Sequence, residues 1–197
     1  MFVCRDAVAY CSFTPIVLTS GGFSTEGCVT IAVDQKGQIV RPLISWQDIR
    51  PQQELEDNAS IIAPEKYYSI TGMPLIANLI VNKINWIRKH EPDVYALTEK
   101  FVQHQDVILK AFGAENFFTD LPSTSFYGAW DVRSANWDNS LLQCFELNPY
   151  QFGQPTPSGT QVGIITSVVA EQTGFPAGTP ICVGAWDQTC GVIGMGS

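Results

Sequence analysis

The sequence predicts an α/β domain, and three observations carry this prediction. The chain has 197 residues, of which 45% are apolar and 15% are charged, so it can bury a full hydrophobic core. Short Val- and Ile-rich runs alternate with segments whose apolar residues recur at helical spacing. The last third is predicted to form a strand, a helix and a second strand, the alternation that is typical of α/β folds.

Several elements are expected in the first half. Residues 28–33 and 38–40 read as two strands of a hairpin, because Val and Ile flank the polar turn Asp34–Gly37. In the clearest helix, Ile76, Ile80, Ile84 and Ile87 form one stripe while Asn82, Asn85 and Arg88 face away. The helices expected here are 52–58, 64–70 before Gly72, 77–89, one that starts at Pro92, and 101–112 closed by Gly113.

The second half is expected to contain fewer helices. Residues 116–136 show no helical period and are expected to form strands and loops, and residues 148–159, with three prolines, are expected to form a loop. The remaining elements predicted are helix 140–146, strand 161–166, helix 167–173 capped by Gly174, strand 180–184, and helix 189–193.

Composition excludes several classes of function. The formal net charge of −8 argues against nucleic acid and against an anionic membrane surface as partners. No run approaches the roughly 20 apolar residues that a membrane-spanning helix needs. The six cysteines lack Cys-x-x-Cys spacing and are interpreted as reduced thiols, and the phosphate-binding loop of P-loop proteins is absent.

The strongest candidate site is Gly184-Ala185-Trp186-Asp187-Gln188, which follows an apolar strand and opens a helix. Ligands of α/β sheets gather where strands end and helices begin. The Asp187 carboxylate has two interpretations that spacing leaves open: it caps the helix, or it accepts a proton from a bound hydroxyl. The amide of Gln188 offers a donor and an acceptor that suit a polyol.

Two tryptophans are candidates for a sugar platform. The indole rings of Trp46 and Trp186 can cover the apolar C–H face of a carbohydrate, although tryptophan is more often a core residue. Asp48 and Arg50 can form a polar clamp, but at this spacing an ion pair that anchors a loop is the commoner arrangement.

These residues fall in an order that resembles the FGGY carbohydrate kinases, a family that includes xylulose and glycerol kinases. The resemblance runs from about Phe23 to Ser197. The residues that carry it are Asp34-x-x-Gly37, Arg41 to Arg50, Thr71-Gly72, Lys83, Trp86, Gln105-Asp106, Trp130-Asp131, Trp137, Val162-Gly163, Ala170 to Gly174, Gly178-Thr179-Pro180 and Gly184-x-x-Asp187-Gln188.

The resemblance implies a ribonuclease-H-like domain of the actin-like ATPase superfamily, with a mixed sheet and flanking helices. It also implies a cytoplasmic kinase that phosphorylates a sugar or polyol with Mg-ATP, and Asp187 as the general base. The remaining residues it assigns to substrate binding are Glu26, Gly27, Cys28, Trp46, Asn78 and Gln188.

The resemblance also sets expectations about domain organisation. Residues 1–22 do not resemble the family, whereas residues 23–197 correspond to its N-terminal, sugar-binding domain. The family's phosphate-binding Asp-x-Gly-Thr motif is absent, and the ATP-binding second domain is expected to be missing. We therefore expect a truncated form with impaired catalysis, which self-associates, for example as a homodimer, or is marginally stable.

Two alternatives remain. The chain can be a catalytically silent sugar-binding module or the remnant of a broken reading frame. It can also be an unrelated α/β domain in which Asp187 caps a helix. The ordered series of motifs disfavours the second of these.

Overall fold

The computed structural model describes residues 20–196, so most of the atypical segment 1–22 lies outside the description. The helices are α2 (Gln52–Ala59), α3 (Pro64–Thr71), α4 (Ile80–His90), α5 (Pro92–Leu97), α6 (His104–Phe112), α7 (Leu121–Thr124), α8 (Asn139–Cys144), α9 (Ser167–Thr173) and α10 (Asp187–Gly194), with 3₁₀ turns η1 (Ser125–Tyr127) and η2 (Pro149–Gln151). The strands are β1 (Ser24–Thr25), β2 (Ile31–Val33), β3 (Lys100–Val102), β4 (Phe118–Asp120), β5 (Trp130–Asp131), β6 (Asn136–Trp137), β7 (Gln154–Thr156), β8 (Gln161–Ile164), β9 (Pro180–Cys182) and β10 (Ala185–Trp186).

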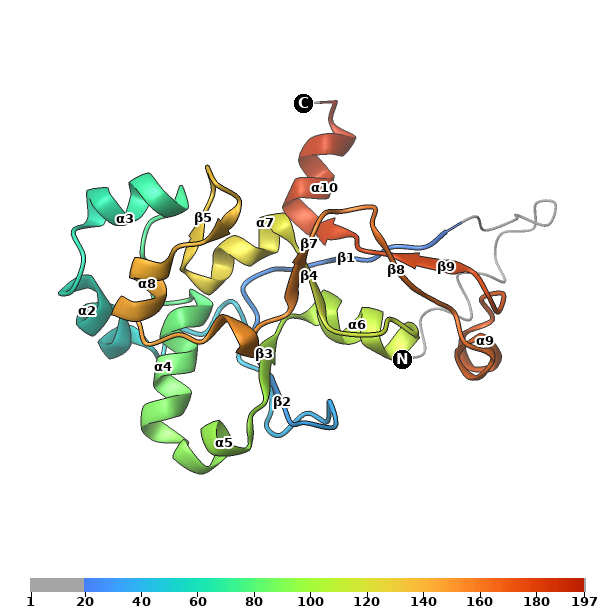
Figure 1. Ribbon diagram of the computed structural model, residues 1–197, viewed down its shortest axis with the longest axis horizontal. Coiled ribbons are helices and arrows are strands. Elements are labelled where there is room, and N and C mark those ends of the chain that lie inside the picture. Colours follow the sequence, from blue (N-terminus) through green and yellow to red (C-terminus); the bar gives the residue numbers. More distant parts are fainter. Residues whose placement is uncertain (1–19, 197) are drawn as a thin grey trace.

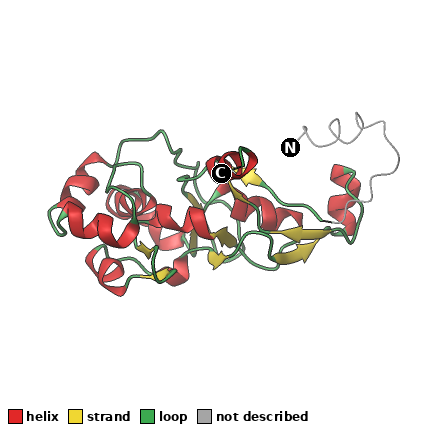
Figure 2. Cartoon of the chain, turned by 90° about the horizontal axis from the view of Figure 1, so that it is seen from above, coloured by secondary structure: helices red, strands yellow, loops and turns green. Residues whose placement is uncertain are grey.

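Within residues 20–196 the strands are short and form five two-stranded sheets, some parallel and some antiparallel, where a single mixed sheet was predicted. β1 pairs with β10 and β4 with β7 in parallel, while β2 with β3, β5 with β6 and β8 with β9 are antiparallel. Figure 1 shows an elongated molecule, with α2 to α5 and α8 gathered at one end, strands in the middle and α9 at the other end. The turned view in Figure 2 shows the same division into a helical end and a strand-rich end.

The main core surrounds α4. Ile80, Ile84 and Ile87 are buried as the predicted stripe requires, and they belong to a cluster that includes Phe101 and Tyr127. Two details of the prediction are wrong. Ile76 precedes the helix and is 40% exposed, and Asn82, predicted to face away, is fully buried because its amide bonds Asn58 and the Ile76 carbonyl. A second cluster, between α6 and the β8–β9 pair, supports the other end of the molecule.

Most predicted helices are confirmed within a few residues. Helix α3 begins at Pro64, which needs no N–H partner there, and it ends at Gly72, whose φ of 67° is left-handed. Helix α9 spans the predicted residues, and the Thr166 hydroxyl accepts the Val169 N–H at its N-terminus.

Three segments differ from the prediction because contacts outside the local pattern decide them. Phe101 and Val102 lie in β3 and not in a helix, since they pair with β2. The expected loop 148–159 contains β7, which pairs with β4. The segment 116–136 contains a short helix, α7, because the Asp120 side chain accepts the Ser123 N–H and caps it.

The hairpin at residues 28–40 is present, with a bridge between Val33 and Ile39, but β2 forms its longer ladder with β3. Among residues 20–196, every helix is too short or too polar to span a bilayer.

Candidate functional site

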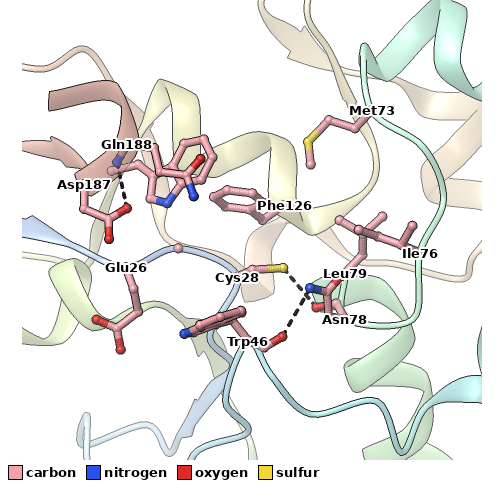
Figure 3. A pocket seen from close by; sticks show the side chains of 12 residues that line it. Glu26, Cys28, Trp46, Met73, Ile76, Asn78, Leu79, Phe126, Asp187 and Gln188 are labelled. Atoms are coloured by element: carbon pink, nitrogen blue, oxygen red, sulfur yellow. Dashed lines mark hydrogen bonds between the residues drawn. The ribbon is translucent and has the colours of Figure 1, made fainter. Parts of the chain in front are cut away.

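A pocket of about 310 Å³ opens where the loop after β1, the loop before α2, the α3–α4 connection and the start of α10 meet. Figure 3 shows its lining side chains. The lining residues are Glu26, Gly27, Cys28, Trp46, Met73, Ile76, Asn78, Leu79, Phe126, Trp186, Asp187 and Gln188. All seven residues that the sequence assigned to catalysis or substrate binding are therefore in one pocket, although they are far apart in the chain.

Asp187 begins α10 directly after β10. Within residues 20–196, the helix has no side-chain cap at its N-terminus, and the Asp187 Oδ1 accepts only the adjacent Gln188 N–H, at 2.7 Å. The residue is exposed at the pocket. Asp187 therefore does not cap the helix, and its carboxylate is free to meet a ligand.

Two buried side chains fix the backbone that leads to Asp187. The Gly184 N–H donates to Gln105 Oε1 at 2.5 Å, and the Gln105 amide donates to Asp120 Oδ2 at 2.8 Å. Asp120 Oδ1 accepts the Trp186 N–H at 3.4 Å. Gln105 and Asp120 are 2% and 1% exposed, so this network is shielded from water and holds β10 in place.

Cys28 adopts a strained backbone, with φ at 60°. Its N–H donates to Gln103 Oε1 at 3.1 Å, its carbonyl accepts the Lys83 ammonium, and its thiol donates to the Asn78 carbonyl at 2.9 Å. Burial raises the pKa of the Cys28 thiol to about 11, so the thiol stays protonated at neutral pH. Burial also lowers the pKa of Lys83 to about 8. Cys28 thus contributes a protonated, hydrogen-bonded thiol to the wall of the pocket.

Glu26 stands at the edge of the pocket in contact with a histidine ring. Its Oε1 lies 2.8 Å from Nδ1 of His104, the first residue of α6. The neighbouring Gly27 is buried against Phe126, and a Cβ at this position would overlap the Phe126 ring. The absence of a side chain at Gly27 therefore lets Phe126 reach the pocket.

Aromatic rings form the walls of the pocket. Trp46 is 46% exposed and is not a core tryptophan, and its carbonyl accepts the Asn78 amide at 3.2 Å. Trp186 meets Phe126 edge to face, with ring centroids 4.9 Å apart. These faces are suited to the C–H surface of a carbohydrate.

Asp48 and Arg50 do not line the pocket. They form an ion pair, with Arg50 Nη2 2.6 Å from Asp48 Oδ2, and the guanidinium lies over the Trp86 ring. The interpretation of this pair as a loop anchor is the one that fits the structure.

Sequence reasoning missed four residues of the pocket. Met73, Ile76 and Leu79 come from the α3–α4 connection, and Phe126 from η1. No local pattern marks them, since only the packing of these elements brings them to Asp187. The sequence predicts no more for His104 than a surface or helix position, and only the fold places it beside Glu26.

A bound magnesium ion needs carboxylates or other oxygen ligands that converge on one point. Within residues 20–196, no group of three or more His, Cys, Asp or Glu side chains could hold a metal ion.

The profile of the FGGY family of carbohydrate kinases, N-terminal domain, matches residues 3–194. The chain belongs to this family. The profile match begins at residue 3. The individual motifs on which the resemblance was based begin only at about Phe23.

Curated relatives of this FGGY kinase chain match most of its length but less of their own. The chain is 26% identical over 180 residues to a xylulose kinase of Staphylococcus xylosus, covering 91% of this chain and 37% of the relative. It is 29% identical over 149 residues to an autoinducer-2 kinase of Salmonella paratyphi B, covering 76% of this chain and 27% of the relative. The chain thus spans about a third of the length of these relatives.

The ligand-bound xylulose kinase of Lactobacillus acidophilus has a similar structure. It matches with a TM-score of 0.87 at 18% identity, over 98% of this chain and 39% of the other. This likeness confirms the predicted mixed α/β fold of the actin-like ATPase type. FGGY kinases use ATP, generally with magnesium, to phosphorylate carbohydrates.

Proposed function

We propose that the pocket binds a sugar or polyol and that Asp187 is the general base for its phosphorylation. The observation that carries this proposal is that Asp187 is exposed in an aromatic-walled pocket and caps no helix. A carboxylate without a structural partner can accept a proton from a ligand hydroxyl.

The reaction we propose is phosphoryl transfer from ATP. Asp187 takes the proton of one sugar hydroxyl while that oxygen attacks the terminal phosphorus of ATP, and ADP leaves. Positioning and electrostatics dominate such transfers. Gln188 and Asn78 are proposed to orient the sugar, Trp46 to cover its C–H face, and Glu26, with Gly27 and Cys28 beside it, to select it.

The partners and setting follow from the same proposal. A small sugar or polyol and ATP are the proposed ligands, and the cytoplasm, where ATP is available, is the proposed location. Because the chain covers 37% of its Staphylococcus xylosus relative, we propose that phosphoryl transfer by residues 1–197 alone is impaired. A homodimer is the proposed assembly.

The proposal is tested by calorimetry and by sugar-dependent ADP formation. We expect a sugar to bind the chain and Trp46→Ala to weaken binding about 10-fold or more, since the platform is lost. Asp187→Asn should lower ADP formation, whatever its absolute rate, by about 100-fold or more with little change in sugar affinity.

The control is Asp93→Asn, which makes the same chemical change on the exposed first turn of α5, far from the pocket. It should leave both readouts unchanged. Unchanged ADP formation in Asp187→Asn would refute the base assignment, and a cooperatively melting chain that binds no sugar would refute the proposed function.

A further inference from the structure

The two ends of the pocket differ in chemistry. Figure 3 shows the carboxylates of Glu26 and Asp187 at one end, with Gln188 beside them. The other end is formed by Met73, Ile76 and Leu79, with the Asn78 amide beside them and Phe126 toward the middle of the pocket. A ligand that fills the pocket therefore meets carboxylates at one end and mainly apolar side chains at the other.

The apolar end offers little to a hydroxyl group. Leu79 and Phe126 are 0% and 5% exposed and form its base, while Ile76 is 40% exposed and forms its rim. Two of the donors closest to this end are already used: one N–H of the Asn78 amide bonds the Trp46 carbonyl, and the Cys28 thiol bonds the main-chain carbonyl of Asn78. The Asn78 Oδ1 accepts no hydrogen bond from the described residues, but it is buried and therefore not presented to a ligand at the apolar end.

A hydroxyl that contacts only Met73 and Ile76 loses its water and gains no partner from these two side chains, which weakens binding by about 10-fold. A methyl group at the same place gains contact with Met73 and Ile76 and leaves water. The apolar end therefore favours a ligand that lacks one terminal hydroxyl.

The charge of the pocket gives a second constraint. Among its 12 lining residues, Glu26 and Asp187 are acidic and none is Lys or Arg. His104 Nδ1 lies 2.8 Å from Glu26 Oε1, and Asp187 has no Lys or Arg beside it within the lining. The Lys83 ammonium is fully buried and donates to the Cys28 carbonyl, so it is not presented to a ligand. An anionic ligand would be repelled.

From these two constraints we propose that the pocket selects an uncharged sugar or polyol with one deoxygenated end, such as a terminally deoxy ketose. Met73 and Ile76 are the proposed specificity residues. This inference rests on the proposed function, since it presumes that the pocket binds a sugar.

Calorimetry on the 197-residue chain with matched ligand pairs tests the inference. The probes are 1-deoxy-D-xylulose against D-xylulose, L-fuculose against L-tagatose, and D-glucitol against D-gluconate. We expect at least one deoxy ketose to bind about 10-fold tighter than its hydroxylated partner, and gluconate to bind about 10-fold more weakly than glucitol or not at all.

Two variants test the apolar end directly. Met73→Gln and Ile76→Asn place hydrogen-bonding groups there and should reduce the preference for the deoxy ligand to about 3-fold or less. Ile61→Asn is the matched control, because Ile61 is 53% exposed and does not line the pocket. It should leave the preference unchanged.

The outcomes separate the two proposals. If sugars bind but the hydroxylated partners bind as tightly as the deoxy ligands, or gluconate binds as tightly as glucitol, the selectivity inference is overturned and the proposed function stands. If no sugar of any pair binds a chain that melts cooperatively, the proposed function fails and the inference fails with it.

Discussion

At the scale of single residues, the pocket depends on Gly27 as much as on its polar groups. Gly27 lies so close to Phe126 that a Cβ would overlap the ring. Cys28, next to it, already has a left-handed backbone held by Gln103 and Lys83. This stretch of chain therefore has little freedom to move away from an added methyl group.

We expect Gly27→Ala to push Phe126 into the pocket and to weaken sugar binding by about 10-fold or more, with about 1–3 kcal/mol lost in the free energy of unfolding. Calorimetry and urea titration measure the two effects. The control is Gly191→Ala, where a Cβ would meet nothing within 4 Å. An unchanged sugar affinity in Gly27→Ala would contradict this account of the pocket.

A second residue-scale prediction concerns Asp106, which is fully buried beneath the site. Its Oδ2 accepts the Gln103 N–H and the Thr119 hydroxyl, but its Oδ1 has no partner among the described residues. Burial raises the pKa of Asp106 from 3.8 to about 7. The folded state thus binds a proton more tightly than the unfolded state does.

The sign of the pH effect follows from this shift. The stabilisation is fully present below the unfolded pKa of 3.8 and is lost as pH rises through about 7. We expect the free energy of unfolding to fall between about pH 4 and about pH 7, and that of Asp106→Asn to fall less over the same range. Equal slopes for the two proteins in urea titrations would contradict the prediction.

Trp46, Asp187 and Gln188 could be predicted from the sequence because they lie in motifs with a fixed order, and Glu26, Gly27, Cys28 and Asn78 were assigned by their places relative to those motifs. Asp187, for example, follows a recognisable apolar strand. Met73 and Ile76 carry no such mark, since an apolar residue in a connection looks the same whether or not it lines a pocket. Their role depends on where α3 and α4 pack.

At the scale of elements, the Asp120 carboxylate connects α7 with β10 by accepting a main-chain N–H from each. Asp120 caps α7 through the Ser123 N–H at 3.1 Å and also accepts the Trp186 N–H of β10. The position of Asp187, the next residue, therefore depends on a residue far away in the sequence.

We expect Asp120→Ala to lower the free energy of unfolding by about 1–3 kcal/mol and to weaken sugar binding as well, because both the cap and the support of β10 are lost. Asp138→Ala is the matched control. Asp138 caps α8 through the Leu141 N–H at 2.9 Å and does not contact β10. It should destabilise the fold without changing the sugar affinity, and equal losses of affinity in both variants would contradict the linkage.

Elements were predictable to the extent that their signals are local. Single local residues mark several helix boundaries. Two helices end at Gly72 and Gly174, and two begin at Pro64 and Pro92. Strands β3 and β7 are three residues each, and distant partners define them. The residues within and beside these strands do not reveal their pairing partners.

At the scale of the whole molecule, α10 presents an apolar surface. Val192, Ile193 and Met195 are 47%, 66% and 77% exposed. Exposed apolar side chains that cluster on one short segment favour association. Figure 1 shows α10 projecting from the body of the molecule, where a second copy can reach it.

We expect the 197-residue chain to self-associate in analytical ultracentrifugation, and Ile193→Ser with Val192→Ser to shift it toward monomer. The control is Val168→Ser, which alters a side chain that is 62% exposed on α9. A chain that is monomeric at all concentrations would contradict the prediction.

The positions of the tryptophans have an optical consequence. Trp46 and Trp186 line the pocket, whereas Trp130 is buried and packs edge to face on Trp137. The fluorescence emission of an indole shifts to shorter wavelength when water is displaced from it. A ligand in the pocket would displace water from the exposed ring of Trp46. Intrinsic fluorescence can therefore follow occupancy of this pocket without a label.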